Sequence, residues 1–325
     1  MYYNGENGYL SLLKDTLANG ENKLTRNGNV ISSFGSMIHF KDISTAFPLI
    51  TSKKMFFRGI VEELLWFLRG STNANELKSK NVHIWDGNST RKYLDSIGLD
   101  YPEGELGPVY GWQWRKFGKE YEHCNEYENE ETEEDIYNDM NGSESSETDA
   151  TYTNTYNKGV DQIKYILEEL SKENNSRRAV LSGWNPVDLK KMALPPCHIL
   201  YIFNKSSKGL SCHMTLRSSD LFLGLPFNIA STALLTQILA HTLHIPAHEV
   251  CLSICDAHIY EEHKQQVNKQ IDSETYDFPK VIIKKDAPDI KSSVDVKIKW
   301  IESLVYEDFE LFNYKSGAAL SAIMK

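Results

Sequence analysis

One stretch of the chain, residues 227–243, carries almost no strongly polar side chain on any helical face: FNIASTALLTQILAHTL. A surface helix keeps one polar face, so a helix that is apolar nearly all round is expected to lie in the centre of a core. No stretch of the chain approaches the roughly 20 apolar residues that cross a bilayer. A chain of 325 residues has ample material to enclose such a helix. We therefore predict one core around residues 227–243, with no linker dividing the chain.

A second helix is predicted over residues 57–68, where apolar side chains recur at helical spacing and Gly70 is placed to end the helix. The pair Glu62-Glu63 interrupts this apolar pattern. Glu62 can point to solvent, whereas Glu63 lies next to the apolar stripe. A carboxylate in that position is more often an edge residue or part of a structural ion pair than a catalytic group.

Helical and extended segments alternate without a regular βαβ order. Residues 160–170 predict an amphipathic helix, and short β-rich runs follow at 179–184, 199–203 and 210–216. This mixture favours an α+β fold over a doubly wound parallel sheet.

The net charge of −10 is concentrated in one segment. Residues 120–150 contain 13 Asp and Glu and no Lys or Arg, which leaves 35 basic against 32 acidic residues, a net charge of +3, for the rest. The segment at about 123–157 is rich in Ser, Thr and Asn and has no hydrophobic period, which is the composition of a disordered loop. We predict a single domain over residues 1–325 with an acidic insertion at about 123–157, and favour a tolerated surface insertion over a regulatory arm.

The five cysteines are odd in number and irregularly spaced. In a chain too long to need disulfide staples they are expected to be reduced, as in an intracellular protein. The N-terminal sequence MYYNGENGYLSLL has no basic region followed by an apolar one, so no secretory signal is expected. We expect a cytoplasmic protein with no membrane contact.

The segment MALPPCH (192–198) carries the strongest chemical signal. Two prolines fix a short loop that presents Cys197 just before a β-rich run. A thiol is a useful nucleophile only as thiolate, so it needs a nearby positive charge or base. His198 is too close in sequence to serve readily as that base, because adjacent side chains of a strand point to opposite faces. Alone, the Cys-His pair would more often be structural.

Arginines at three places strengthen the case for an anion site. They are Arg26 in a turn-rich segment, the pair Arg177-Arg178 at the start of a β-rich run, and Arg217, which precedes Ser218. Arginine suits bidentate phosphate recognition, and serine adds a hydroxyl donor. Neither a P-loop nor a dinucleotide-binding glycine pattern is present.

Two other kinds of site are disfavoured. Cys251, Cys255 and His258 have a spacing that could suggest zinc, but no second ligand pair stands at finger spacing, so we expect no metal. We also expect no DNA binding, because the sequence has neither a basic stripe nor an aromatic stacking motif.

Taken together, the motifs resemble those of the thymidylate synthase family. The matching segments run in the family order from about residue 26 to 313, outside the acidic insertion, and their combination is far more specific than any single motif. They are FPLITSKK (47–54), EELLWFLRGSTN (62–73), IWD (84–86), LGPVYGWQWR (106–115), SRR (176–178), WNP (184–186), MALPPCH (192–198), LRSSDLFLGLPFNIAS (216–231) and DAHIY (256–260).

This resemblance implies the reductive methylation of dUMP to dTMP, with 5,10-methylenetetrahydrofolate donating both the one-carbon unit and the hydride. It implies an α+β subunit with a large mixed β-sheet flanked by helices. It also implies an obligate homodimer in which the sheets pack face to face and Arg177 and Arg178 act in trans, each site borrowing them from the other subunit.

The resemblance also implies roles for the residues of the dUMP site. Cys197 matches the nucleophile that adds to C6 of uracil, and Arg217 would favour its thiolate and hold phosphate. Asn228 matches the residue that reads the base, because its amide can donate to O4 and accept from N3–H. The positions that match dUMP-binding residues are Arg26, Arg177, Arg178, Arg217, Ser218, Asn228, His258 and Tyr260.

For the folate side, Glu63 matches the carboxylate that organises water and relays protons, with Tyr110 and His198 as supporting members of its polar network. Asp220 matches the carboxylate that binds the pterin. The implied catalytic residues are Cys197, Glu63, His198, Tyr110, Asp220 and Arg217. The implied folate contacts are Lys53, Phe56, Ile84, Trp85, Asn88, Asp220, Leu223, Gly224 and Phe227.

Several positions depart from the family pattern. The Arg26 loop is one residue shorter, Leu216 replaces a glutamine, Ile254-Cys255 replaces the usual small, Gly-containing pair before Asp256, and the tail lacks the YNPHP sequence. Two alternatives stay open. One is a dUMP hydroxymethylase on the same scaffold, which Trp85 disfavours. The other is a non-enzymatic paralogue that binds nucleotide or partners through the acidic insertion.

Overall fold

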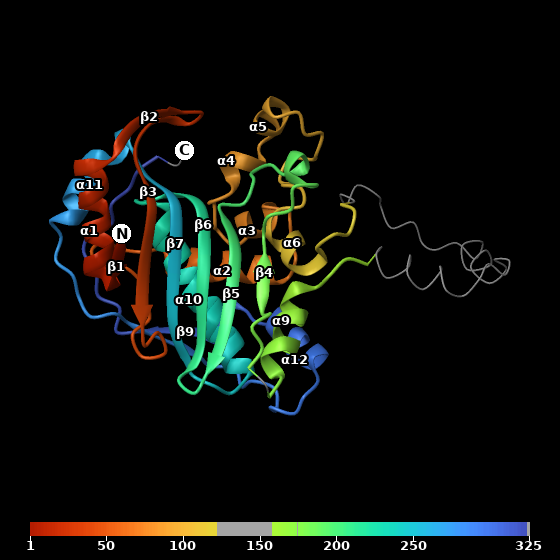
Figure 1. Ribbon diagram of the computed structural model, residues 1–325. Helices are drawn as coiled ribbons and strands as arrows, with labels where there is room; N and C mark the ends of the chain where they lie inside the picture. Colours follow the sequence, from red (N-terminus) through yellow and green to blue (C-terminus); the bar gives the residue numbers. More distant parts are fainter. Residues whose placement is uncertain (122–157, 174, 324–325) are drawn as a thin grey trace.

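A mixed β-sheet forms the centre of the computed structural model, which describes residues 1–121, 158–173 and 175–323 (Figure 1). The acidic insertion predicted at about 123–157 lies outside these residues. In spatial order the strands of the sheet are β1 (Tyr2–Asn4), β3 (Gly28–Lys41), β7 (Ala247–Tyr260), β6 (Gly209–Asp220), β5 (His198–Ser206) and β4 (Val180–Ser182), and β2 (Glu21–Thr25) also pairs with β3.

The crossover between β6 and β7 contains the buried helix that the sequence predicts. β6 and β7 run parallel, so the chain must cross over between them, and α10 (Gly224–Thr242) makes this connection. Ile229, Leu234 and Ile238 of α10 have no exposed surface. The helix begins three residues before the predicted start, because its first turn tolerates Pro226.

The other helices lie behind the sheet or at its edges. Figure 1 shows α10 and α2 behind the sheet and α1 and α11 at one edge, and no described helix crosses the front face. The helices besides α10 are α1 (Gly5–Asn19), α2 (Phe57–Leu68), α3 (Asn75–Lys78), α4 (Asp86–Ser89), α5 (Arg91–Ser96), α6 (Tyr110–Lys116), α9 (Gln162–Ser171), α11 (Lys264–Ile271) and α12 (Val294–Glu302). Three short 3₁₀ turns, η1 (Leu189–Lys191), η2 (Glu261–His263) and η3 (Tyr306–Asp308), and a small antiparallel pair, β8 (Lys280–Ile283) and β9 (Phe309–Phe312), complete these elements.

The predicted α+β class is confirmed, and so are its main elements. α2 has the predicted bounds, and Gly70 takes the positive φ of 76° that suits a residue just past a helix end. β6 runs four residues beyond its predicted end, because its polar last residues are held by pairing with β7 rather than by an apolar pattern. None of the helices in the described ranges has the length and apolar character needed to span a bilayer.

The expectation that Glu62 can point to solvent is wrong. Glu62 is only 3% exposed, and its carboxylate lies 2.7 Å from Nζ of Lys80. Arg58, one turn earlier, adds a second cation at 3.9 Å. A buried carboxylate needs such partners, so Glu62 forms a structural ion pair. The pattern within α2 could not reveal Lys80, which lies in another segment.

Candidate active site

The Cys197 thiol lies beside Arg217 at the point where β5 begins. Nη2 of Arg217 is 3.8 Å from Sγ of Cys197, and the backbone N–H of Arg217 donates to the Cys197 carbonyl at 2.9 Å. The guanidinium also donates to the carbonyls of Pro195 and Pro196, so the proline loop holds it in place. The backbone N–H of Cys197 donates to the Tyr110 hydroxyl at 2.7 Å. Five separate contacts therefore fix the thiol and its cation relative to one another.

Two opposing effects act on the Cys197 thiol. Burial raises its pKa, because an apolar environment disfavours the thiolate, and the charge of Arg217 lowers it. Burial is the larger effect, so the pKa is raised. The resting thiol therefore keeps its proton at neutral pH, and Arg217 is positioned to stabilise the thiolate when it forms.

The Glu63 carboxyl lies beside the aromatic side chains of Trp85 and Tyr110. Its Oε1 accepts a hydrogen bond from Nε1 of Trp85 at 2.8 Å. Burial raises the pKa of Glu63 to about 7, and the hydrogen bond from Trp85 opposes this rise. A carboxyl group with a pKa near 7 can both give and take a proton under physiological conditions.

His198 and Tyr110 stack on one another next to this carboxyl. Their ring centroids are 4.0 Å apart with an interplanar angle of 11°. Nδ1 of His198 lies 2.6 Å from the Tyr201 hydroxyl, and burial lowers the pKa of His198 to about 3. The imidazole is therefore neutral at neutral pH and acts as a hydrogen-bonding group. The sequence did not predict Tyr201, which is part of an otherwise ordinary β pattern.

Several predicted nucleotide-binding residues meet across β6 and β7. The strand register places Ser218 opposite Asp256 and Asp220 opposite His258. Nδ1 of His258 lies 3.4 Å from the Ser218 hydroxyl and 3.2 Å from the Asp256 carboxylate. Asn228 lies in the first turns of α10, directly after this strand.

Arg26 approaches the same region from the hairpin between β2 and β3. The hairpin loop consists of Arg26 and Asn27, and β3 then pairs Val30 with Tyr260. Burial raises the pKa of Tyr260, and both a hydrogen bond from Asn27 and the charge of Arg26 oppose this rise. The shortened loop therefore still brings Arg26 close to Tyr260.

Arg177 and Arg178 do not join this cluster. They precede β4, and the carbonyl of the next residue, Ala179, accepts from the N–H of Phe203. Cys197 lies at the opposite end of β5, six residues from Phe203. At about 3.3 Å per residue, the two ends of this strand segment are roughly 20 Å apart. Both arginines are exposed, and neither lies beside the thiol of its own chain.

Six of the predicted folate residues lie in two segments of the chain, one next to Glu63 and the other directly after Asp220. One segment contains Ile84, Trp85 and Asn88, and the other contains Leu223, Gly224 and Phe227. Phe56 is 43% exposed and lies at the start of α2. Asp220 accepts a hydrogen bond from the Phe222 N–H at 2.9 Å.

Lys53 is turned inward. It is 4% exposed, donates to the Phe222 carbonyl and lies 3.8 Å from the centroid of the Phe222 ring. Burial lowers its pKa to about 7, and the charge of Asp220 opposes this fall. The amino group of Lys53 is therefore directed towards Phe222 and away from solvent. Its contact with folate stays a prediction.

Cys251, Cys255 and His258 all lie on β7. In the described part of the chain, no group of three or more His, Cys, Asp or Glu side chains is arranged to hold a metal ion. The four cysteines in that part are free thiols.

Comparison with known proteins identifies one family. A family model described as thymidylate synthase matches residues 7–325. A bifunctional dihydrofolate reductase-thymidylate synthase of Paramecium tetraurelia is 44% identical over 96% of this chain and 59% of its own length. One from Glycine max is 41% identical over 94% of this chain and 51% of its own length, so the chain spans little more than half of these relatives. A protein of Encephalitozoon cuniculi named thymidylate synthase 1/2 is 39% identical over 98% of this chain and 97% of its own length.

Proposed function

The chain belongs to the thymidylate synthase family, and from this we propose that it methylates dUMP to dTMP, consumes 5,10-methylenetetrahydrofolate and releases dihydrofolate. The observation that carries the proposal is the pair formed by the Cys197 thiol and the Arg217 guanidinium at 3.8 Å. We further propose that the protein acts in the cytoplasm.

The first chemical step is addition of the Cys197 thiolate to C6 of the uracil ring. A bond forms between sulfur and C6, and the electron pair of the C5–C6 double bond makes C5 nucleophilic enough to attack the methylene carbon of the folate. Arg217 supports this step in two ways, because its positive charge favours the thiolate and its remaining donors suit a phosphate oxygen. Loss of the C5 proton then breaks the bond between the methylene carbon and the folate nitrogen, which departs with that electron pair and leaves an exocyclic methylene on C5. Hydride from the folate adds to this methylene to complete the methyl group, and the Cys197 thiolate leaves C6 as the C5–C6 double bond re-forms.

Glu63 is suited to the proton transfers that these steps need. With a pKa of about 7 its carboxyl can exchange protons with water or substrate near neutral pH. Trp85 donates to one carboxylate oxygen, which leaves the other without a hydrogen-bond partner among the described residues and available for such exchange. Neutral His198 and Tyr110 extend this network without adding charge.

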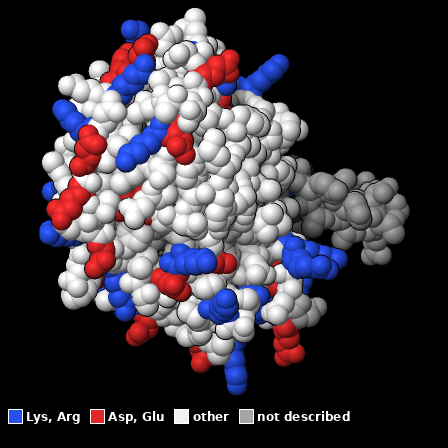
Figure 2. Space-filling view, turned by 60° about the vertical axis from the view of Figure 1, so that its left-hand side comes forward, with Lys and Arg blue, Asp and Glu red and all other residues white. Residues whose placement is uncertain are grey.

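The front face of the sheet fits a second copy of the chain. On β6 and β7 the residues that pack against α10 are buried, whereas the alternate residues, such as His213, Thr215 and Ser253, are half-buried and uncharged for the most part. Figure 2 shows charged side chains along the top, at the left and across the lower part of the view, with an uncharged area between them, above and to the right of the centre.

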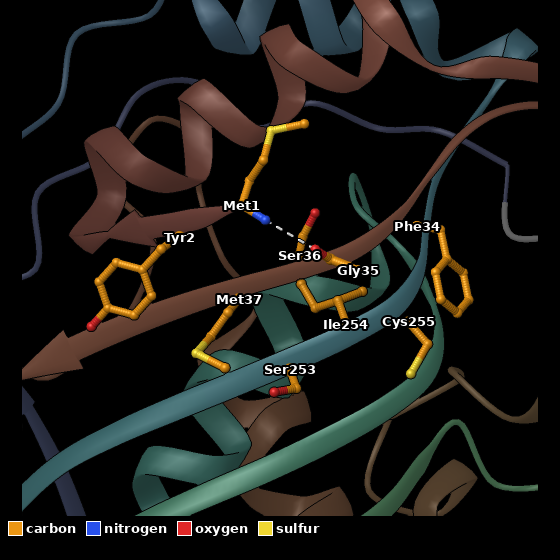
Figure 3. Close-up of a pocket in the computed structure, with 9 residues that line it drawn as sticks. All are labelled: Met1, Tyr2, Phe34, Gly35, Ser36, Met37, Ser253, Ile254 and Cys255. Atoms are coloured by element: carbon orange, nitrogen blue, oxygen red, sulfur yellow. Dashed lines mark hydrogen bonds between the residues drawn. The ribbon is translucent and has the colours of Figure 1, made fainter.

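A shallow pocket of about 530 Å³ opens on strands β3 and β7 of this sheet (Figure 3). Phe34, 80% exposed, and Tyr2, 57% exposed, are among the residues that line it. Clustered apolar exposure of this kind is typical of an interaction surface. A homodimer is favoured over other partners, because Arg177 and Arg178 lie roughly 20 Å from the Cys197 thiol of their own chain, and a second copy could supply them to the site.

A spectrophotometric assay with dUMP and methylenetetrahydrofolate tests the activity. Dihydrofolate and dTMP are expected as products. Formation of hydroxymethyl-dUMP without dihydrofolate would indicate the hydroxymethylase, and the absence of turnover would indicate a binding protein.

A second experiment tests the covalent step with 5-fluoro-dUMP. A covalent adduct that survives denaturation is expected, since fluorine cannot leave as a proton. The Cys197→Ser variant should form no adduct, and its turnover rate should fall by several orders of magnitude, because an unactivated alcohol is a poor nucleophile. Full labelling of this variant would overturn the role of Cys197.

A further inference from the structure

His263 lies buried between the C-terminal tail and Asp220. It is 1% exposed, and its ring contacts those of Phe222 and Tyr260, with centroids 5.6 and 5.3 Å away. Nε2 lies 2.8 Å from the carbonyl oxygen of Ile323, in the tail. Nδ1 lies 3.8 Å from Oδ2 of Asp220 and has no hydrogen-bond partner among the described residues. One imidazole therefore faces a tail carbonyl with one nitrogen and a carboxylate with the other.

The two neighbours of the ring constrain its protons. A carbonyl only accepts, so Nε2 must carry the proton that it donates to Ile323. A neutral ring would then turn the lone pair of Nδ1 towards the Asp220 carboxylate, where two acceptors would repel each other. A second proton on Nδ1 replaces this repulsion with an attraction between opposite charges. The imidazolium is thus the form that suits both neighbours at once.

The charges around His263 agree with this conclusion. Burial lowers its pKa, but Asp220, the Ile323 carbonyl and Glu262 act in the opposite direction and the pKa is raised. The charges of Lys53 and Asp220 also act on one another, and the ring of Tyr260 meets that of His263 edge-on. Asp220 itself is held by the Phe222 N–H, so it stays in place to face the imidazole.

The tail reaches this position through backbone contacts. The N–H of Gly317 donates to the Thr51 carbonyl at 2.8 Å, and the N–H of Lys54 donates to the Ala318 carbonyl at 3.2 Å. The side chain of Ile323 is 71% exposed, so its carbonyl rather than its side chain attaches this end of the tail.

We propose that His263, as a cation, is a positioning residue that links the C-terminal tail to Asp220, so that docking of the tail and the negative charge of Asp220 stabilise each other. Such coupling is reciprocal, because each partner must favour the other by the same factor. The inference rests on the proposed function only where it concerns folate, which Asp220 is predicted to bind.

The test measures tail docking in the full, unliganded chain by hydrogen exchange of the backbone amides of Gly317 and Lys54, which donate across the contact between the tail and residues 51–54. His263→Gln keeps a donor for Ile323 but has no charge, and Asp220→Asn removes the charge that the imidazole faces without touching the tail. Both should speed exchange roughly tenfold, the effect expected of a lost charge-assisted contact. His244→Gln is the matched control, since His244 also bonds a backbone carbonyl, that of Pro288, but lies exposed on the surface. Slow, unchanged exchange in Asp220→Asn would overturn the proposal.

A second measurement keeps His263 in place. Its pKa, followed by NMR, should fall in Asp220→Asn and also in a chain that ends at Leu320, and an unchanged value in either protein would overturn the proposal. If His263→Gln fails to fold, this pKa measurement still tests the proposal. Neither measurement needs turnover, so failure of the proposed activity would leave the link intact. In an active enzyme, His263→Gln should raise KM for the folate about tenfold and leave the affinity for dUMP unchanged.

Discussion

The indole Nε1 of Trp85 lies 2.8 Å from Oε1 of Glu63, so a residue expected to contact folate also holds the carboxyl expected to relay protons. This contact opposes the effect of burial on the pKa of Glu63, which stands at about 7. The indole therefore adjusts the protonation of the carboxyl as well as shaping the pocket.

Replacing Trp85 should shift the pH dependence of the reaction. In Trp85→Phe the carboxylate loses a donor that stabilises its charged form, so the pKa of Glu63 should rise. The apparent pKa in the kcat profile should move up by about half a unit to one unit. Trp112→Phe is the control, because the indole nitrogen of Trp112 has no partner in the described residues. A profile of Trp85→Phe that overlays the original would show that this hydrogen bond does not act on the titrating group.

Glu63 should cost the protein stability above pH 5. Its pKa is raised from 4.5 in the unfolded chain to about 7 in the folded one, so the folded state is disfavoured as pH rises through this window. Glu63→Gln removes the titration and keeps an acceptor for Trp85. We expect the variant to be more stable by about 1–3 kcal/mol at pH 8, after allowing for the partial exposure of the group, and nearly equal at pH 4.5. Chemical denaturation at both pH values checks this, and an equal difference at both would contradict it.

Mixed dimers should recover activity if Arg177 acts in trans. A Cys197→Ala chain and an Arg177→Ala chain are each impaired, but together they form one complete site per mixed dimer. Random mixing should therefore restore roughly a quarter of the original activity at low dUMP concentration. The matched control pairs Cys197→Ala with Glu63→Gln, two changes on the same side of the site, which should not complement. Failure of the first pair, with mixed dimers verified, would place Arg177 in the site of its own subunit.

Asn228 should determine the choice of uracil over cytosine. Its amide supplies one donor and one acceptor in the order that uracil requires, whereas ionised Asp supplies acceptors only. Asn228→Asp should lose dUMP methylation and gain activity on dCMP. Each mispaired group costs about 1–3 kcal/mol, so the preference should shift by roughly 10²- to 10⁴-fold. The ratio of kcat/KM for the two nucleotides measures this shift, and an unchanged ratio would remove Asn228 from base recognition.

The sequence predicted features that depend on a local pattern. The apolar composition of residues 227–243 predicted that this helix is buried, and the two prolines before Cys197 predicted that this residue is held in a fixed position. The approach of Arg217 to Cys197 followed from the family resemblance, and the pairing of β5 with β6 provides its physical cause.

Features that depend on a distant partner could not be predicted in this way. Glu62 is buried because Lys80 pairs with it, and Lys53 turns inward because the Phe222 carbonyl accepts from it. His263 belongs to no motif that the sequence singled out, and its position between Asp220 and Ile323 depends on where the tail packs. In each case the deciding contact joins residues that are far apart in the sequence, and no local sequence pattern indicates that they meet.

The pairing of β3 with β7 has a consequence for synthesis on the ribosome. The register places Val30 opposite Tyr260, so this edge of β3 finds its partner only after 260 of 325 residues have been made. At about 5–20 residues per second, the N-terminal hairpin waits on the order of ten seconds or more with that edge unpaired. An unpaired edge is a template for other strands. The nascent chain should therefore depend on chaperones that shield this edge until the last fifth of translation.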